Sequence, residues 1–75
     1  MRATSSFIRF QVNSSSISTI GYSPMAQVME VVFLRGAVYR YVGVPALIFA
    51  AFLLAASKGR YFNTNFKNHY AFTRV

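Results

Sequence analysis

The alternation of apolar and polar positions predicts three strands in the first part of the chain. The stretch "ISTIGY" (17–22) is rich in β-branched residues, which favour a pleated surface. The stretches "VMEVVFL" (28–34) and "AVYRYV" (37–42) follow, and Arg35-Gly36 between them indicates a hairpin turn. Because short connections join neighbouring antiparallel strands, we expect a meander.

Two registers of the predicted hairpin are open, and they place the tyrosines on different faces. A two-residue turn pairs Phe33 with Val38. Tyr39 and Tyr41 then share a face with Glu30, and they form an exposed surface on which bases could stack, as in aromatic sheets that bind RNA.

A longer connection pairs Phe33 with Tyr39 and gathers the apolar residues of both strands on one face. The members of this face are Met29, Val31, Phe33, Tyr39 and Tyr41. Glu30 and Arg40 then share the opposite face as diagonal neighbours. We favour this register because it separates the strand charges from the apolar face. It turns both tyrosines toward the core.

Helical spacing of apolar residues predicts two helices in the second part of the chain, at 45–57 and 60–70. In the first, Ile48 and Phe52 should pack on the sheet, and in the second Phe62 should do so. The outward face of the first helix is also apolar: Ala46, Leu47, Ala50, Ala51 and Leu54. Such a face is covered by a second layer or serves as a contact surface.

Together these elements predict an α+β domain, a three-stranded antiparallel β-meander followed by two helices packed on one face. We expect this single domain over residues 13–72, with a C-terminal tail at 73–75. Residues 1–12 form a basic N-terminal segment, which is either a tail or an extra edge strand. The alternation in "IRFQV" allows the strand, but we favour the tail because chain ends are loose unless they dock.

The charge of the chain is strongly unbalanced. Its 75 residues contain eight Lys and Arg against one acidic residue, for a formal net charge of +7. Such an excess attracts polyanions or anionic surfaces. The chain contains no cysteine and only one histidine, so neither a disulfide nor a metal cage is expected, and no cofactor. A domain this small must rely on efficient packing or on self-association.

A membrane span is not expected. The uncharged stretch between Arg40 and Lys58 would reach only about 26 Å as a helix, against about 30 Å for the hydrocarbon core. Gly43 and Pro45 shorten it further. The N-terminus lacks a secretory apolar region followed by a small-residue cleavage site, and we expect a cytoplasmic location.

The sequence also argues against an enzyme. The acid Glu30 and the histidine His69 fall in different predicted elements, so they form no evident acid–base pair. The serines at 14–16 have no base nearby in the sequence, and no glycine-rich phosphate loop is present.

Cations and aromatic residues instead crowd the last third of the chain, a composition that favours nucleic-acid binding. The candidate binding residues are Arg40, Lys58, Arg60, Tyr61, Lys67, His69 and Arg74. The spacing of the aromatic residues also fits a helix face in the core, and the cations alone would then hold a phosphate backbone without sequence preference. The alternative is a protein partner or homo-oligomer, bound through Leu47, Ala50, Ala51 and Leu54.

Several short motifs, taken in order, resemble the KTSC domain family over about residues 14–70. They are Gly21-Tyr22, the pair Tyr39 and Tyr41, Val44-Pro45, the group Ser57, Gly59, Tyr61, Phe62 and Asn63, and Tyr70. The family is named for its occurrence at the C-terminus of some lysyl-tRNA synthetases, and it also occurs in small bacterial and phage proteins. That context implies RNA as a ligand. This chain departs from the family pattern in its shortage of acids, with Ser23 where an acidic turn residue is usual.

Overall fold

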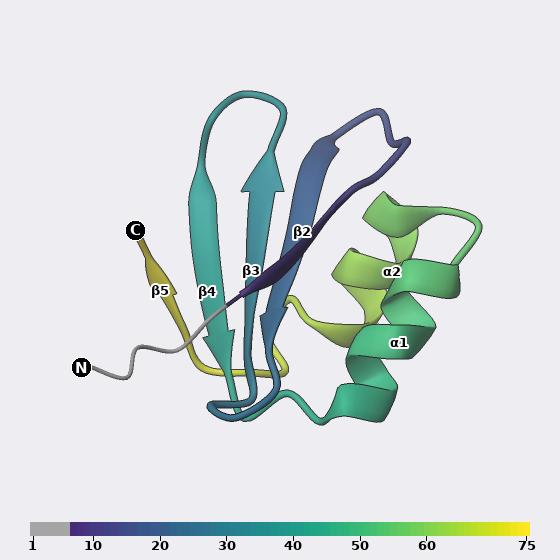
Figure 1. Cartoon of the computed structure of the whole chain (residues 1–75). Helices are drawn as coiled ribbons and strands as arrows, with labels where there is room; N and C mark the ends of the chain where they lie inside the picture. The colour runs from purple at the N-terminus through teal and green to yellow at the C-terminus, as the bar shows by residue number, and fades with distance from the viewer. Residues whose placement is uncertain (1–6) are drawn as a thin grey trace.

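The computed structural model describes residues 7–75, and these form a five-stranded sheet and two helices (Figure 1). The elements are β1 (Ile8–Gln11), β2 (Ile17–Ser23), β3 (Val28–Phe33), β4 (Val38–Val42), α1 (Ala46–Leu54), α2 (Lys58–Asn65) and β5 (Phe72–Arg74). The α+β class and the two helices are confirmed. The prediction of three strands is wrong, because a further strand joins the sheet at each end.

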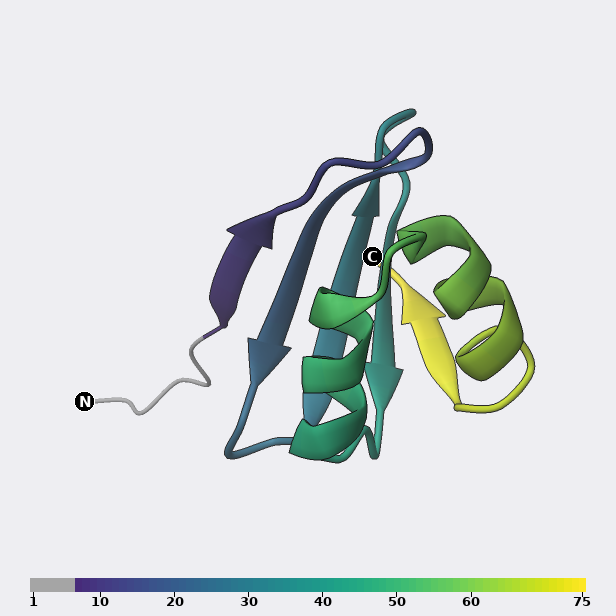
Figure 2. The same cartoon turned by 90° about the vertical axis from the view of Figure 1, so that its right-hand side faces the viewer.

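The sheet is antiparallel throughout, with the strands in the order β1-β2-β3-β4-β5. Both helices lie between β4 and β5 in the chain and pack on one face of the sheet (Figure 1). In the rotated view α1 lies over β2 and β3, and α2 lies toward β4 and β5 (Figure 2). The other face of the sheet has no helix over it in the part of the chain described.

The N-terminal edge strand is β1, where a loose tail was the favoured prediction. Residues 8–11 pair with β2, from Ile8 opposite Tyr22 to Gln11 opposite Thr19. The pairing satisfies backbone groups at an edge of β2 that would otherwise stay open. The first six residues of the predicted N-terminal segment lie outside the described part of the chain.

The C-terminal edge strand is β5, where the sequence suggested a tail from residue 73. Phe72 lies opposite Tyr41, and Arg74 lies opposite Tyr39. The backbone N–H of Val75 also donates to the carbonyl oxygen of Val38, at a distance of 2.8 Å. The two helices return the chain to the free edge of β4, and this long-range step was not visible in the local pattern.

The hairpin of β3 and β4 has the predicted faces but a different register. Tyr39 lies opposite Val31, whereas the favoured prediction placed it opposite Phe33, two residues further along β3. Glu30 and Arg40 are therefore direct rather than diagonal partners. The reason is a three-residue connection in which Gly36 takes a φ of 101°, a left-handed value that suits glycine.

The core lies between the sheet and the two helices. Its fully buried side chains include Ile17, Ile20, Met29, Val31, Val44, Phe52 and Phe66. Phe49 of α1 stacks on Tyr22 of β2, with ring centroids 4.6 Å apart. On the outward face of α1, Leu47 and Leu54 are 84% and 86% exposed, while Ala51 is half-buried.

Both helices are shorter than the sequence suggested. The hydroxyl oxygen of Ser57 accepts from the backbone N–H of Arg60 at 3.3 Å and caps the start of α2. Beyond its end, Phe66 is fully buried and packs on Tyr70 at 5.6 Å, whereas His69 is exposed. Within residues 7–75 neither helix is long and apolar enough to cross a membrane.

Candidate functional site

A groove of about 400 Å³ opens between the β3–β4 hairpin, the end of α2 and β5. We call it the aromatic groove, and its lining residues are Phe33, Arg35, Ala37, Tyr39, Tyr41, Phe62, Asn63, Lys67, Asn68 and Phe72. Its volume falls within the range of about 300–1,000 Å³ that is usual for ligand pockets. It therefore has room for a small planar group.

The rings of Tyr39, Tyr41 and Phe72 form the floor of the aromatic groove. Tyr39 and Tyr41 lie at 17° to each other, and the Phe72 ring is tilted by 30° from Tyr39 and 34° from Tyr41. The strand register explains this, because Phe72 is the direct partner of Tyr41 and side chains of direct partners share a face. Phe72 is 53% exposed and Tyr39 is partly exposed, whereas Tyr41 is only 3% exposed, so the part of the floor that a ligand can reach is Phe72 and the edge of Tyr39.

Two further rings stand as walls on this floor. Phe33 meets Tyr39 edge-on at 84°, and Phe62 of α2 meets Tyr41 edge-on at 78°. Phe33 and Phe62 also pack against each other, with centroids 5.4 Å apart. The result is a corner of aromatic rings in which Tyr41 and Phe62 are buried, and a flat ligand could stack on Phe72 with its edge toward Phe33.

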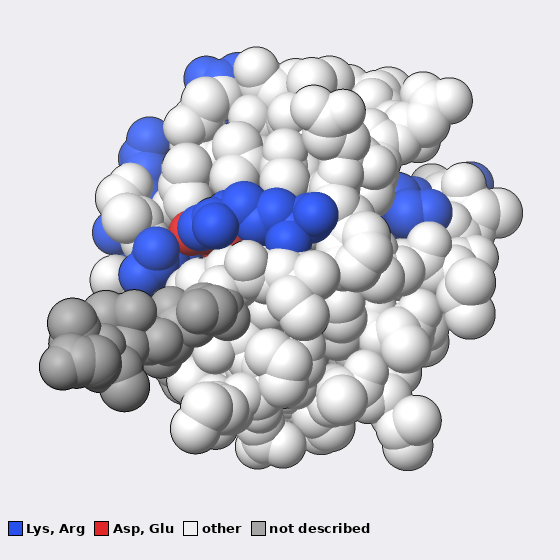
Figure 3. Space-filling model, viewed as in Figure 1, with Lys and Arg blue, Asp and Glu red and all other residues white. Residues whose placement is uncertain are grey.

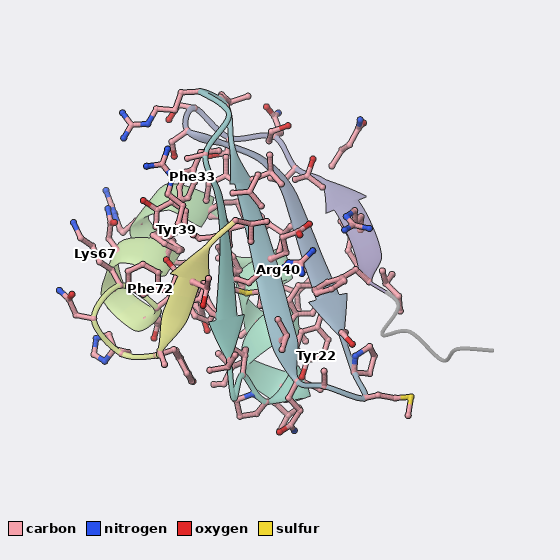
Figure 4. The ribbon with its side chains drawn as sticks, turned by 90° about the vertical axis from the view of Figure 1, so that its left-hand side faces the viewer. Tyr22, Phe33, Tyr39, Arg40, Lys67 and Phe72 are labelled. Carbon is pink, nitrogen blue, oxygen red and sulfur yellow. The ribbon has the colours of Figure 1, made fainter. Side chains whose placement is uncertain are left out.

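Cations surround this corner. Arg35 in the hairpin turn and Lys67 after α2 both line the groove and are exposed. Arg74 lies beside the floor of the groove, because it is the direct partner of Tyr39 and shares its face. In Figure 4 the labelled Phe33, Tyr39, Phe72 and Lys67 lie together near β5, and Arg40 lies apart in front of the sheet.

The single acidic residue of the chain is held on the opposite face of the sheet. Glu30 is 5% exposed, and its carboxylate is bound by Arg9 at 3.1 Å and Arg40 at 3.0 Å. The two guanidinium groups also lie over the Phe7 ring, at 5.2 and 4.9 Å from its centroid. Figure 3 shows the small red patch of this carboxylate largely covered by blue side chains.

Gly21 makes this ion cluster possible. It lies between Arg9 and Glu30 in the sheet, as the direct partner of both. A Cβ atom at this position would lie 3.2 Å from the Cγ atom of Arg9. Because Gly21 has no side chain, Arg9 can pass over β2 and reach the carboxylate on β3.

The two most deeply buried tyrosines, Tyr22 and Tyr41, stay protonated at neutral pH. Burial raises the pKa of Tyr41 to about 12, and the neighbouring Tyr39 adds to this effect. Burial also raises the pKa of Tyr22, whose hydroxyl donates to the carbonyl oxygen of Val44. The Tyr41 phenol at the floor of the groove therefore contributes no negative charge that would repel a phosphate.

The structure divides the predicted binding residues among separate regions. Arg40 lies on the outer face of the sheet and is paired with Glu30. Lys58 lies near β1, where its ammonium group donates to the carbonyl oxygen of Ala55. Arg60 is exposed on the first turn of α2 and does not line the groove. None of these three cations therefore lines the groove.

The remaining predicted residues lie closer to the groove, except for Tyr61. Lys67 lines it, Arg74 flanks its floor, and His69 is exposed in the connection that follows Lys67. Tyr61 points into the core and stacks on Phe52 at 5.5 Å and 16°. The helical spacing favoured a place in the core for this ring over a role in stacking bases, and the structure agrees with the core position.

Sequence reasoning missed three residues of the site: Phe33 and Phe72 as ligand-facing rings, and Arg35 as a rim cation. Arg35 was recognised only as part of a turn. The alternation in "FTR" (72–74) is the signal that could have indicated β5, because it places Phe72 and Arg74 on one face.

Two of the shorter motifs have structural roles. Tyr22 and Val44 are joined by the hydrogen bond described above, which ties β2 to the segment before α1. At Gly59, a Cβ atom would lie 3.1 Å from the hydroxyl oxygen of Ser16, so a side chain there would press on the β1–β2 connection.

Comparisons with known proteins agree on one family. The family model described as "KTSC domain" matches residues 13–70. A protein of Stutzerimonas stutzeri is 46% identical over 68 residues, covering 89% of this chain and 96% of that protein. A protein of Tsukamurella paurometabola is 42% identical over 52 residues, covering 69% and 78% of the two chains.

A solved structure has the same fold. The crystal structure of a KTSC domain protein from Yersinia pestis superposes with a TM-score of 0.87 at 35% sequence identity. The alignment covers 93% of this chain and 99% of the Yersinia chain. The family match over most of the chain and this shared fold lead to the same conclusion: the chain belongs to the KTSC domain family.

Proposed function

We propose that this chain is a non-enzymatic basic module that binds nucleic acid, RNA in particular, without strong sequence readout. The observation that carries the proposal is the separation of charge between the two faces of the sheet. Glu30 is neutralised on the outer face by Arg9 and Arg40. The face that carries the aromatic groove has cations and no acidic side chain, so it offers an unopposed positive field to a phosphate backbone.

The expected strength of this electrostatic contribution follows from the number of cations. Arg35, Lys67 and Arg74 supply three charges at or beside the groove. Each phosphate contact with a single strand contributes about −0.7 to the slope of log K against log salt concentration. Three contacts give a slope of about −2, and a fourfold rise in salt then weakens binding about 20-fold.

A salt titration tests this proposal. The full chain would be mixed with a fluorescently labelled oligouridylate, and the dissociation constant would be measured by fluorescence anisotropy at increasing potassium chloride. We expect binding at low salt that weakens with a slope of about −2. Failure to bind the strand at the lowest salt, or an affinity that salt does not change, would refute nucleic-acid binding.

A second candidate is a protein-interaction or self-associating module, and the outward face of α1 favours it. Leu47 and Leu54 are almost fully exposed, and Ala50 between them is exposed as well. Burial of each of these two leucines against a partner would contribute about 1.5–3 kcal/mol of favourable free energy, and a domain of this size has few other sources of stability. Association of this kind is apolar, so we expect it to persist at high salt, unlike the binding of a strand.

A further inference from the structure

We propose that the aromatic groove receives an unpaired base, so that the ligand of this domain is a single strand and not a duplex. This inference rests on the proposed function and adds the class of nucleic acid to it. The groove has a floor of three rings inclined by 17–34° to one another, of which Phe72 is exposed, Tyr39 is partly exposed and Tyr41 is buried beneath them, and Phe33 stands edge-on beside this floor. A base has two flat apolar faces and a polar edge, and these match a stacking floor beside polar rim groups.

The rim supplies groups for the other parts of a nucleotide. Arg35 and Lys67 lie at the rim as cations for the phosphate, and Asn63 and Asn68 are exposed there as amides that can hydrogen-bond a base edge. An acidic peptide would use the cations but would leave the floor uncovered. An uncharged aromatic or proline-rich segment would cover the floor but would leave the cations without partners. A nucleotide satisfies both sets of groups.

A second hollow continues the groove. It has a volume of about 390 Å³ and shares Phe33, Arg35, Phe62 and Asn63 with the aromatic groove. It extends past these shared residues to Ser15 and Ser16. A strand whose base occupies the floor therefore has room to continue across Arg35, with no need to leave the surface.

The geometry also explains why a duplex should be excluded. The floor lies between the hairpin turn and the α2–β5 connection, so a base must leave its stack to reach it. Bases in a duplex are stacked and paired, and their faces are not available. A duplex can still contact Arg35 and Lys67 through its phosphates, but it gains nothing from the rings.

The test compares three fluorescently labelled RNAs of about ten nucleotides: an oligouridylate, the same backbone with abasic sites, and a blunt duplex. They would be titrated with the wild-type chain and with Phe72→Leu, which keeps an apolar side chain on β5 but removes the stacking ring. The matched control is Phe10→Leu, the same change on the other edge strand, where Phe10 is 40% exposed. Circular dichroism would confirm that both variants are folded.

We expect the wild-type chain and Phe10→Leu to bind the oligouridylate about tenfold more tightly than the abasic strand. In Phe72→Leu this preference for bases should largely disappear, while the salt dependence remains. Equal, salt-dependent binding of all three RNAs by the wild-type chain would overturn the base-binding groove but leave nucleic-acid binding in place. Absence of binding to any of the three at low salt would overturn the proposed function itself.

Discussion

Replacement of Phe52 by alanine is expected to lower the free energy of unfolding by about 3–5 kcal/mol. Phe52 is fully buried in α1 and packs against Phe66, with ring centroids 5.0 Å apart, and against Tyr61. Its removal leaves a cavity at the point where the two helices meet. Native proteins have total stabilities of about 5–15 kcal/mol, so this single change should remove a large share of the stability of the domain.

Urea unfolding followed by circular dichroism measures this effect, and Leu47→Ala is the matched control. Leu47 belongs to the same helix but is 84% exposed, so its replacement should change the free energy of unfolding by no more than about 0.5 kcal/mol. Equal stability of the two variants would show that α1 is not packed on the sheet as described.

The second large effect is expected on ligand binding. The double variant Arg35→Gln/Lys67→Gln removes both cations that line the aromatic groove. We expect the salt slope for an oligouridylate to fall from about −2 to about −0.7, because about 0.7 is lost with each contact. Affinity at low salt should drop about tenfold or more, and anisotropy titrations of the two proteins at several salt concentrations would measure both quantities.

The control for this variant is Lys58→Gln/Arg60→Gln, which removes the same charge from the first turn of α2. These residues lie outside the groove, and loss of positive charge at a helix N-terminus does not destabilise the helix. The control should keep the slope and affinity of the wild-type chain. Equal losses in both double variants would mean that net charge, and not the groove, determines binding.

The faces of the central hairpin could be predicted from sequence because its charges are few. Glu30 and Arg40 are the only charged residues in the two predicted strands, and any register that keeps them together places Tyr39 and Tyr41 toward the helices. The register itself depended on the backbone conformation of Gly36, which permits a three-residue connection. Side-chain pattern alone fixes the parity of a register but not its offset.

The edge strands and the groove could not be predicted, because each depends on contacts between distant parts of the chain. The short strand β5 pairs with β4, although two helices separate these strands in the sequence. The groove joins Phe33, Phe62 and Phe72, which come from three elements. Aromatic residues at such positions fit a core equally well by pattern, so only the fold shows which of them remain accessible to a ligand.

The most direct test of the account is to map ligand contacts by nuclear magnetic resonance. Amide chemical shifts of the labelled full chain would be recorded during titration with an oligouridylate at low salt. We predict that the largest shifts fall on residues 33–41 and 67–74, which surround the aromatic groove. Shifts confined to α1, or to the outer face around Arg9 and Arg40, would contradict the assignment of the groove as the binding site.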